Sequence, residues 1–440
     1  MKRKKSANTF IGRTGLKLFQ KSNLIPFFVI FWLVLAILAD VIATDRPLAI
    51  KTEQGVIYPA FSAILNPHRI DRYKLGSEDK QERILDHDHV DWKQLPNDWV
   101  IWAPVPWSHE KPDVYNRDFA APGGKQKIKS ANGHMTDIPF RFRHLMGTDR
   151  LGRDLMAMLI HGSRISLKIG LLSTLIAGLI GILLGAFSGY YGNDRLRLGR
   201  GSYILAIFGF LIGLFWAFIS GSPRLNAGFE SGLFHASIQI FLSFAITAVC
   251  TILAILAGKL FFRQEVRVSV PVDQFVQRFS EVFSSMPKIL ILLTLAAVLK
   301  DRSVGMVIAI IGLTGWTGVS RYTRAELLRI RELPYIEAAR MQGISVSRII
   351  FRHALPNAMG PVIVELSFLV SASILAESSL SFLGIGVPVE VSTWGSILSE
   401  GRQDLDAWWM VIFPGLAIFM TVYLFNALGR RFRASQLSRR

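Results

Sequence analysis

Long apolar runs separated by polar segments dominate the pattern along this chain. Eight runs approach the roughly 20 residues that a helix needs to cross a hydrocarbon core of about 30 Å. They cover Leu24 to Ala43, Ile165 to Tyr190, Tyr203 to Ser220, Phe234 to Ala257, Val282 to Leu299, Val304 to Val319, Met359 to Glu377 and Ala407 to Leu428. Pro287 and Lys288 interrupt the fifth run. The pattern predicts an all-α membrane protein with eight spans.

The polar segment between the sixth and seventh runs predicts two short helices. Pro334 suits the first turn of a helix, and Gly343 supplies the left-handed position that commonly follows a helix end. Ser345 can cap a second helix, which Pro356 is expected to end. We therefore expect two short helices that meet at a glycine elbow.

Composition and charge agree with a membrane protein. Hydrophobic residues make up 51% of the chain and charged residues 19%, while the net charge is +18. The basic residues gather in 1–21, 195–200, 259–267, 321–352 and 430–440. With eight spans and a cytoplasmic N-terminus, every one of these clusters lies on the cytoplasmic face, as the positive-inside rule requires. Anionic lipid headgroups explain the same lysines and arginines that could otherwise suggest phosphate binding.

The N-terminal third divides into a basic leader, an anchor and an exported segment. Residues 1–23 form the cytoplasmic leader, and 24–43 exceed the length of a signal-peptide core, which favours a retained anchor over cleavage after Ala43. Residues 44–143 are rich in Pro, Asp, His and Trp and predict a small, irregular exported domain. Asp86 to His89 alternate acid and histidine, but a third or fourth ligand at a metal-site spacing is missing, so no metal is predicted. The lone Cys250 excludes an intrachain disulfide.

Small and ionisable residues inside the runs suggest packing and path positions. Gly181, Gly185 and Gly189 recur every four residues, which favours close helix packing, with a mobile gate as the alternative. Charges facing lipid are costly, so ionisable residues in spans are candidates for a solute path. Glu377, with Ser379 and Ser381, is the candidate here, and a structural hydrogen bond to a neighbouring helix is an equal alternative.

Several motifs together resemble one transporter family. They are Gly147-Thr148-Asp149 with Gly152-Arg153-Asp154, the series Asp273, Arg278, Glu281 and Pro287, Ser379 to Gly386, Trp394 to Ser396, Glu400 to Arg402, Phe413 to Leu416, and Glu337 to Gly343 followed by Leu355-Pro356. This set resembles the inner-membrane permeases of ABC importers for dipeptides, oligopeptides or nickel, and the last motif resembles their EAA loop. His353 departs from the general EAA pattern and is similar to the peptide subfamily.

The resemblance implies a six-helix permease core over 144–194 and 271–430, a coupling loop over 321–358, and a cytoplasmic tail over 431–440. Residues 195–270 depart from the family and predict an inserted transmembrane hairpin. The loop residues implied to contact an ATPase are Glu337, Ala338, Ala339, Gly343, Arg348, Leu355 and Pro356.

The implied partners are a homologous second permease, two cytoplasmic ABC ATPases, an extracytoplasmic solute-binding protein and the lipid membrane, without nucleic acid. The sequence holds no Walker A pattern, so ATP and Mg are expected at the ATPases, with no cofactor bound by this chain and no enzymatic activity. The expected cargo is peptides or similar small solutes, and the expected location is the bacterial inner membrane with both termini cytoplasmic. An ATP-independent secondary transporter or channel is the alternative, but its inverted repeats are not found; a membrane-embedded enzyme is a third reading, without a nucleophile-base or metal set to support it.

Overall fold

The computed structural model describes residues 24–52, 55–65, 71–72, 84–85, 92, 99–129, 135–224, 227, 233–262, 266–298, 303–388 and 390–437. The chain divides into two compact units, the first from 1–171 and 374–428, and the second from 172–373 and 429–440.

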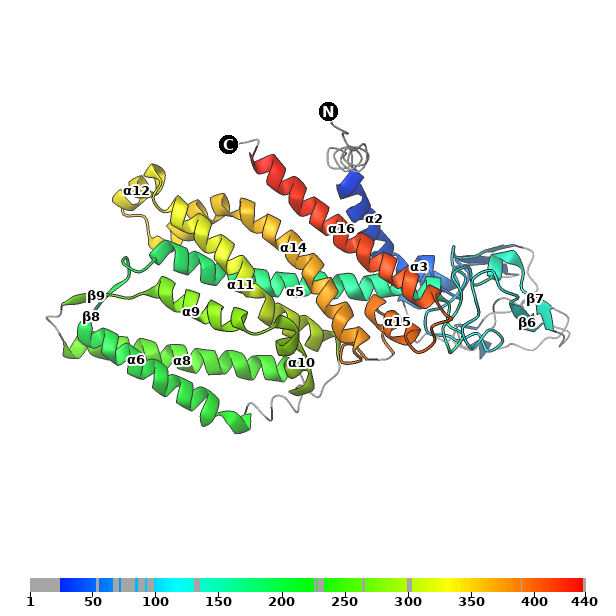
Figure 1. Ribbon diagram of the computed structural model, residues 1–440, viewed down its shortest axis with the longest axis horizontal. Helices are drawn as coiled ribbons and strands as arrows, with labels where there is room; N and C mark the ends of the chain where they lie inside the picture. The colour runs from blue at the N-terminus through cyan, green and yellow to red at the C-terminus, as the bar shows by residue number, and fades with distance from the viewer. Residues whose placement is uncertain are drawn as a thin grey trace, which may run out of the picture. The chain divides into compact units, whose positions relative to one another are not determined.

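The secondary structure is dominated by helices (Figure 1). The helices are α2 (Leu24–Ile37), α3 (Ala39–Ile42), α4 (Pro59–Leu65), the 3-10 turn η3 (Phe140–Phe142), α5 (Leu155–Tyr191), α6 (Arg200–Leu214), the π-helical segment η4 (Phe215–Ile219), α8 (Leu233–Phe261), α9 (Val272–Ser285), α10 (Lys288–Val298), α11 (Val304–Ile330), α12 (Pro334–Met341), α13 (Val346–Arg348), the π-helical segment η5 (Ile349–Ala354), α14 (Leu355–Phe382), α15 (Trp394–Gly401) and α16 (Trp409–Leu437). The strands are β1 (Ala49–Thr52), β2 (Gly55–Ile57), β3 (Asp71–Arg72), β4 (Ile84–Leu85), β5 (Val100–Ile101), β6 (Lys127–Lys129), β7 (Met135–Asp137), β8 (Arg197–Gly199) and β9 (Arg267–Ser269).

Six helices within the described residues are long and apolar enough to cross a membrane. They are Leu155–Tyr191, Arg200–Ile219, Leu242–Phe261, Val304–Ile330, Val346–Phe382 and Trp409–Gln436. The prediction of an all-α membrane protein is therefore confirmed. The other two of the eight predicted spans take different forms.

The fifth predicted span is bent. Helices α9 and α10 meet at an angle of 81° around Pro287. Proline has no backbone N–H and disfavours helical geometry in the residue before it, so the apolar run breaks at this point. The two helices count as one broken span or as a re-entrant pair.

The first predicted span is shorter than expected in the described residues. Helix α2 has 14 residues, which is about 21 Å of helix and less than a typical hydrocarbon core. The guanidinium of Arg164 accounts for the break after Ile37, because it donates to the carbonyl oxygens of Ala36 and Ile37 at 3.1 Å each and pairs with Asp40 at 2.7 Å. Asp40 therefore serves an ion pair with α5.

In the first unit, residues 44–143 contribute short antiparallel strands. The order β2–β1–β5 forms one sheet, with Ile50 opposite Ile57 and Ala49 opposite Ile101. Two further ribbons pair β3 with β4 and β6 with β7. These strands have two to four residues each, so side-chain contacts with the rest of the unit must supply much of their stability.

A segment of this region lies along the Gly147 to Asp154 loop. Backbone hydrogen bonds join the two, from Asp113 N to Gly152 O at 2.9 Å, from Phe119 N to Asp149 O at 3.2 Å, and from Thr148 N to Ala120 O at 3.0 Å. Gly152 has φ 91°, and a Cβ there would collide with the carbonyl oxygen of Asp113. The loop therefore needs glycine at this position.

In the second unit, α5 and α11 pack at very close range. A Cβ added at Gly181, Gly185 or Gly189 would fall less than 3.0 Å from a backbone oxygen of α11, namely that of Trp316, Ser320 or Arg324 respectively. Such contact lets two helix backbones approach in lipid, where dispersion replaces the hydrophobic effect as the source of attraction. The three glycines thus lie where the two backbones approach each other, while packing as their role in the membrane stays a prediction.

Helices α6 and α8 pack against each other within the second unit (Figure 1). Gly209 and Gly213 of α6 face Ala254, Thr247 and Cys250 of α8. The antiparallel pair β8–β9 joins the two ends of this segment. The two apolar helices expected between 195 and 270 are therefore present, while their peripheral place in a membrane stays a prediction.

Candidate functional site

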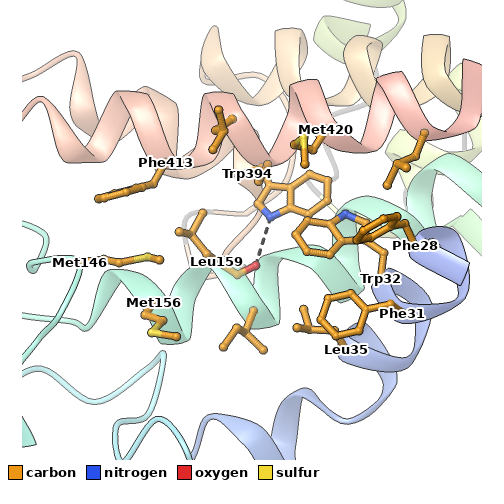
Figure 2. Close-up of a pocket in the computed structure, with 14 residues that line it drawn as sticks. Phe28, Phe31, Trp32, Leu35, Met146, Met156, Leu159, Trp394, Phe413 and Met420 are labelled. Carbon is orange, nitrogen blue, oxygen red and sulfur yellow. Dashed lines mark hydrogen bonds between the residues drawn. The ribbon is translucent and has the colours of Figure 1, made fainter. Parts of the chain in front are cut away.

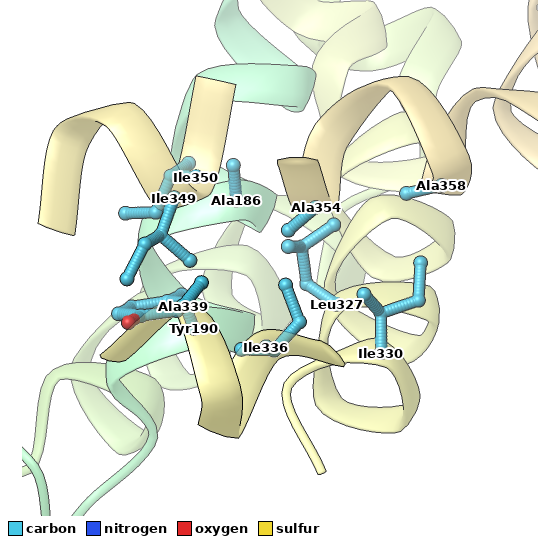
Figure 3. Close-up of a cluster of buried hydrophobic side chains, with 10 residues drawn as sticks. All are labelled: Ala186, Tyr190, Leu327, Ile330, Ile336, Ala339, Ile349, Ile350, Ala354 and Ala358. Carbon is cyan, nitrogen blue, oxygen red and sulfur yellow. The ribbon is translucent and has the colours of Figure 1, made fainter. Parts of the chain in front are cut away.

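The segment from α12 to the start of α14 is the first candidate site, and its apolar face is buried. Ile336 and Ala339 of α12 and Ile349 and Ile350 of η5 join one cluster in the second unit. Figure 3 shows these side chains pointing toward side chains of α5 and α11, among them Tyr190 and Leu327. The cluster holds the segment on the ends of two long helices, so that a force on the segment acts directly on them.

The opposite face of the segment is exposed and chemically mixed. Glu337, Ala338 and Arg348 are exposed. The Met341 side chain is 91% exposed and Phe351 is 46% exposed. Large apolar side chains in water beside charges are typical of a surface that a protein partner covers.

The elbow between the two short helices has the geometry of a Schellman motif. Gly343 has φ 74°, its N–H donates to Arg340 O at 3.0 Å, and Ile344 N–H donates to Ala339 O at 3.2 Å. These are the two bonds that close a helix through a left-handed residue. Ser345 stands at the predicted cap position of the next helix, but its hydroxyl makes no capping hydrogen bond.

The expected stop at Pro356 is wrong. The helix continues from Val346 to Phe382, with Leu355 still in helical geometry. The six residues before Leu355 are π-helical. A π-helical stretch shifts the hydrogen-bond ladder, so that the missing N–H and the ring of proline are accommodated without a break. Leu355 packs against the buried cluster, and Pro356 is exposed.

A hollow of about 740 Å³ adjoins this segment within the second unit. Its lining residues come from α11, α12, α14 and α16, and they are Arg329, Ile330, Leu333, Tyr335, Pro356, Asn357, Gly360, Pro361, Phe432, Ser435 and Gln436. The lining mixes polar and apolar groups, which suits a protein surface element better than a hydrocarbon chain.

The second candidate site surrounds Glu377 in the first unit. Its carboxylate is fully buried and accepts hydrogen bonds from Ser166 at 3.2 Å, Ser378 at 3.4 Å and Ser381 at 2.9 Å. The Ser379 hydroxyl instead donates to the carbonyl oxygen of Leu375, and the residue is half-buried. The carboxylate thus joins α14 to α5, and its role in a solute path stays a prediction.

An apolar cavity of about 370 Å³ lies elsewhere in the first unit. Figure 2 shows Trp32, Trp394 and Met420 among the side chains around it, with Trp394 Nε1 donating to Leu159 O at 3.1 Å. Its described lining residues carry no ionisable side chain. A peptide backbone would find too few hydrogen-bond partners there, so this cavity is a poor candidate for a peptide path.

Sequence reasoning did not pair Asp273 with its partners. The carboxylate of Asp273 is bound by the Arg324 guanidinium of α11 through both oxygens, one of them at 2.6 Å, and it accepts a hydrogen bond from Ser188 of α5 at 2.6 Å. An acid in the first turn of the strongly amphipathic α9 was the available signal. Its partners lie 51 and 85 residues away and only the fold reveals them.

Comparisons with known proteins show what the chain is similar to. The family of binding-protein-dependent transport system inner membrane components matches residues 250–436, a range that contains α12, α13 and η5. The chain is 28% identical over 295 residues to the dipeptide transport system permease protein DppC of Bacillus subtilis, covering 67% of this chain and 68% of that protein.

Two further relatives are similar over almost the whole chain. The inner membrane ABC transporter permease protein YejE of Escherichia coli is 26% identical over 402 residues, covering 91% of this chain and 88% of that protein. The peptidoglycan transport system permease protein YejE of Agrobacterium fabrum is 26% identical over 411 residues, covering 91% and 84%. The likeness therefore reaches into parts of 44–143 and 195–270, beyond the ranges in which the motifs lie.

Proposed function

We propose that this chain, an inner-membrane permease of the binding-protein-dependent ABC importers, moves peptides or similar small solutes into the cell with ATP hydrolysed by partner subunits. The observation that carries the proposal is the coupling segment, Glu337 to Pro356. Its apolar face is buried against α5 and α11, and its other face is exposed and lies within the range that matches the family. Motion of an ATPase bound there would be passed to two long helices.

The proposed assembly follows because this chain moves the solute and partner subunits hydrolyse the ATP. Two ABC ATPases bind the coupling segments of this chain and of a homologous second permease, and ATP and Mg are used at the ATPases. An extracytoplasmic solute-binding protein delivers the cargo. The names of the relatives, which include dipeptide, glutathione and peptidoglycan transport systems, support a peptide-like cargo.

The coupling segment also sets the proposed orientation. An ATPase works in the cytoplasm, so the end of α11 that carries α12 faces the cytoplasm. The basic clusters then lie on the same side, as the positive-inside rule requires. Both chain termini are proposed to be cytoplasmic, with residues 44–143 outside, where they can meet the binding protein.

Two substitutions test the coupling segment. A side chain at the left-handed Gly343 costs roughly 1 kcal/mol, and a β-branched one costs more. Gly343→Val should therefore change the angle at the elbow between α12 and the helix that begins at Val346, while the long helices still insert. Glu337→Lys reverses an exposed charge on the same face. We expect both variants to insert and to pair with the second permease, but to lose at least about tenfold in transport in proteoliposomes and to retain less ATPase in pull-downs.

Gly123→Val is the matched control, because Gly123 has φ 73° and open space around a Cβ, as Gly343 does, but lies in the 44–143 region. It imposes the same backbone strain outside the coupling segment. Wild-type transport and ATPase retention in Gly343→Val and Glu337→Lys would refute the proposal for this surface. A loss of ATPase retention of equal size in Gly123→Val would show that strain, and not coupling, was measured.

A further inference from the structure

Two arginines lie over one tyrosine at the end of α5, and a third lies beside Gly192, two residues further along the chain. The guanidinium carbon of Arg195 lies 5.4 Å from the ring centre of Tyr190, and that of Arg340 lies 6.0 Å from the same centre. Arg331, at the end of α11, lies close enough to Gly192 that a Cβ there would collide with its Nη1. All these residues belong to the second unit. The group, which we call the Tyr190 arginine cluster, joins α5, α11 and the coupling helix α12.

The Tyr190 arginine cluster carries more positive than negative charge. Among its described contacts, Glu332 is the carboxylate that serves both Arg195, at 3.1 Å, and Arg331, at 2.9 Å. Burial and the nearby charges of Arg340 and Arg331 lower the pKa of Arg195. Like charges this close repel one another, so the cluster favours an additional anion.

The guanidinium groups are placed so that an anion can reach them. Arg195 and Arg331 expose about a fifth of their side chains, 23% and 20%, and Glu332 exposes 59%. The Nε–H of Arg331 is itself buried and has no hydrogen-bond acceptor among the described residues, so an anion would meet the exposed part of this guanidinium and not its Nε. Arginine presents several N–H groups in a fixed fork that matches the oxygens of phosphate.

We propose that the Tyr190 arginine cluster binds a phosphate oxyanion, carried by an anionic phospholipid headgroup or by free phosphate, and that this anion ties the coupling helix to the end of α5. A headgroup is sterically natural here, since the cluster follows the last residues of membrane-spanning helices. Arginines at such a level gain binding energy from the anionic leaflet. The inference rests on the proposed function only for assigning this end to the cytoplasmic face.

Lipid binding by the full-length chain tests the proposal without any ATPase or cargo. The chain is purified in detergent, offered equal amounts of phosphatidylglycerol and phosphatidylcholine, and examined by native mass spectrometry. We expect phosphatidylglycerol to be retained roughly tenfold more than phosphatidylcholine. The double variant Arg195→Gln with Arg340→Gln should abolish this preference. The double variant Arg195→Lys with Arg340→Lys keeps the charges and should keep most of it.

The matched control removes two exposed arginines elsewhere. Arg278→Gln with Arg329→Gln lowers the net charge by the same amount, but these side chains pair with Glu281 and Glu326 of their own helices. It should retain phosphatidylglycerol as the wild type does. If Arg195→Gln with Arg340→Gln prefers phosphatidylglycerol as strongly as the wild type does, the cluster does not bind the lipid headgroup.

A second arm separates the two sources of phosphate. The thermal unfolding midpoint is measured in phosphatidylcholine nanodiscs while inorganic phosphate is added up to about 20 mM, so that a site with a Kd of about 1 mM would be nearly saturated. A rise in the wild type that is absent from the glutamine variant assigns the site to free phosphate. If the wild type and the double glutamine variant respond alike to phosphatidylglycerol and to phosphate, the proposal is wrong. The coupling function is tested separately, by the Gly343→Val experiment.

Discussion

His144 lies between two carboxylates in the first unit, where it cannot be neutral without losing a hydrogen bond. Its Nδ1 is 2.9 Å from Asp154 and its Nε2 is 3.3 Å from Asp113, while the Trp107 ring lies 4.0 Å away between ring centres. Both ring nitrogens donate only in the cationic imidazolium. The residue thus acts as a buried positive charge that joins the 44–143 region to the start of α5.

This arrangement predicts a loss of stability at alkaline pH. Burial alone lowers the pKa of His144, but the hydrogen bonds and charges of Asp113 and Asp154 outweigh it and raise the pKa above 6.5. A raised folded-state pKa means that the contribution is complete below about pH 6.5 and disappears as pH rises through the folded-state value. We expect the thermal unfolding midpoint of the detergent-purified chain to decrease as the pH is raised above about 6.5.

His144→Gln should flatten this pH dependence and lower stability by about 1–3 kcal/mol at neutral pH. His109→Gln is the control, since burial first and then His161 lower the pKa of His109 to about 4, so it does not titrate in this range. A His144→Gln profile with the same alkaline slope as the wild type would contradict the assignment.

At acidic pH, Asp113 has the opposite effect, because its pKa is lowered in the folded chain. Burial raises its pKa, but the hydrogen bonds from His144 and Asn116 outweigh burial and lower it below 3.8. A depressed folded-state pKa gives stability that is present at neutral pH and is lost as pH falls through that value. The group of His144, Asp113 and Asp154 therefore stabilises the fold most at pH values where Asp113 is ionised and His144 is still protonated.

Glu377 allows the two interpretations of the second candidate site to be separated. Glu377→Gln keeps most of the side chain's volume, but it turns an acceptor into a partial donor that faces three hydroxyl groups. If the residue is structural, transport and the unfolding midpoint should fall together, with a stability loss of about 1–3 kcal/mol. A variant with wild-type stability but reduced transport would instead place Glu377 in the solute path.

At the scale of elements, helix pairs in this chain meet through glycine. The Gly181, Gly185 and Gly189 face of α5 brings its backbone against α11, and Gly209 and Gly213 do the same for α6 and α8. Side-chain volume, and not polarity, decides these contacts, because lipid is as apolar as the interface.

Gly185→Ala tests this packing. The added methyl group would meet the carbonyl oxygen of Ser320 and the Cβ of Thr323, and neither can move without shifting α11. We expect a stability loss of about 1–3 kcal/mol, as in other overpacked interiors. Thermal unfolding of the purified chain measures it.

Gly415→Ala in α16 is the matched control, since a Cβ there meets no atom within 4 Å. It should be neutral or slightly stabilising, because alanine favours the helix. Similar losses in both variants would mean that helix propensity, and not the α5 to α11 contact, was responsible.

At the scale of the whole molecule, the distribution of charge predicts topology. Tags at Asp88 and Gly228 should be accessible from outside the cell, and tags at Gln264 and the C-terminus should be accessible only from inside. Asp88, Gly228 and Gln264 lie outside the described residues, so labelling in intact and permeabilised cells is the direct measurement. A C-terminal tag labelled in intact cells would contradict the proposed orientation and the pairing of basic clusters with the cytoplasm.

Much of the architecture follows from the sequence alone. The apolar runs and the positions of Pro334 and Gly343 predict the long helices and the elbow, because hydrophobic length and backbone preference are local properties of the chain. The motifs identify the family for the same reason: Gly147 to Asp154 and Glu337 to Gly343 are contiguous in the sequence.

Other features depend on residues that meet only in the folded chain. No local sequence signal near Pro356 predicts the π-helical segment through which the helix continues. Arg164, which binds the last carbonyl oxygen of α2, lies 127 residues away in the sequence. Charges are the clearest case. Arg324 has its own carboxylate partner, Asp273, whereas Arg195 shares the carboxylate of Glu332 with Arg331. Which of these arrangements an arginine has depends on which helices pack together, because electrostatic energy is set by distance in space and by burial.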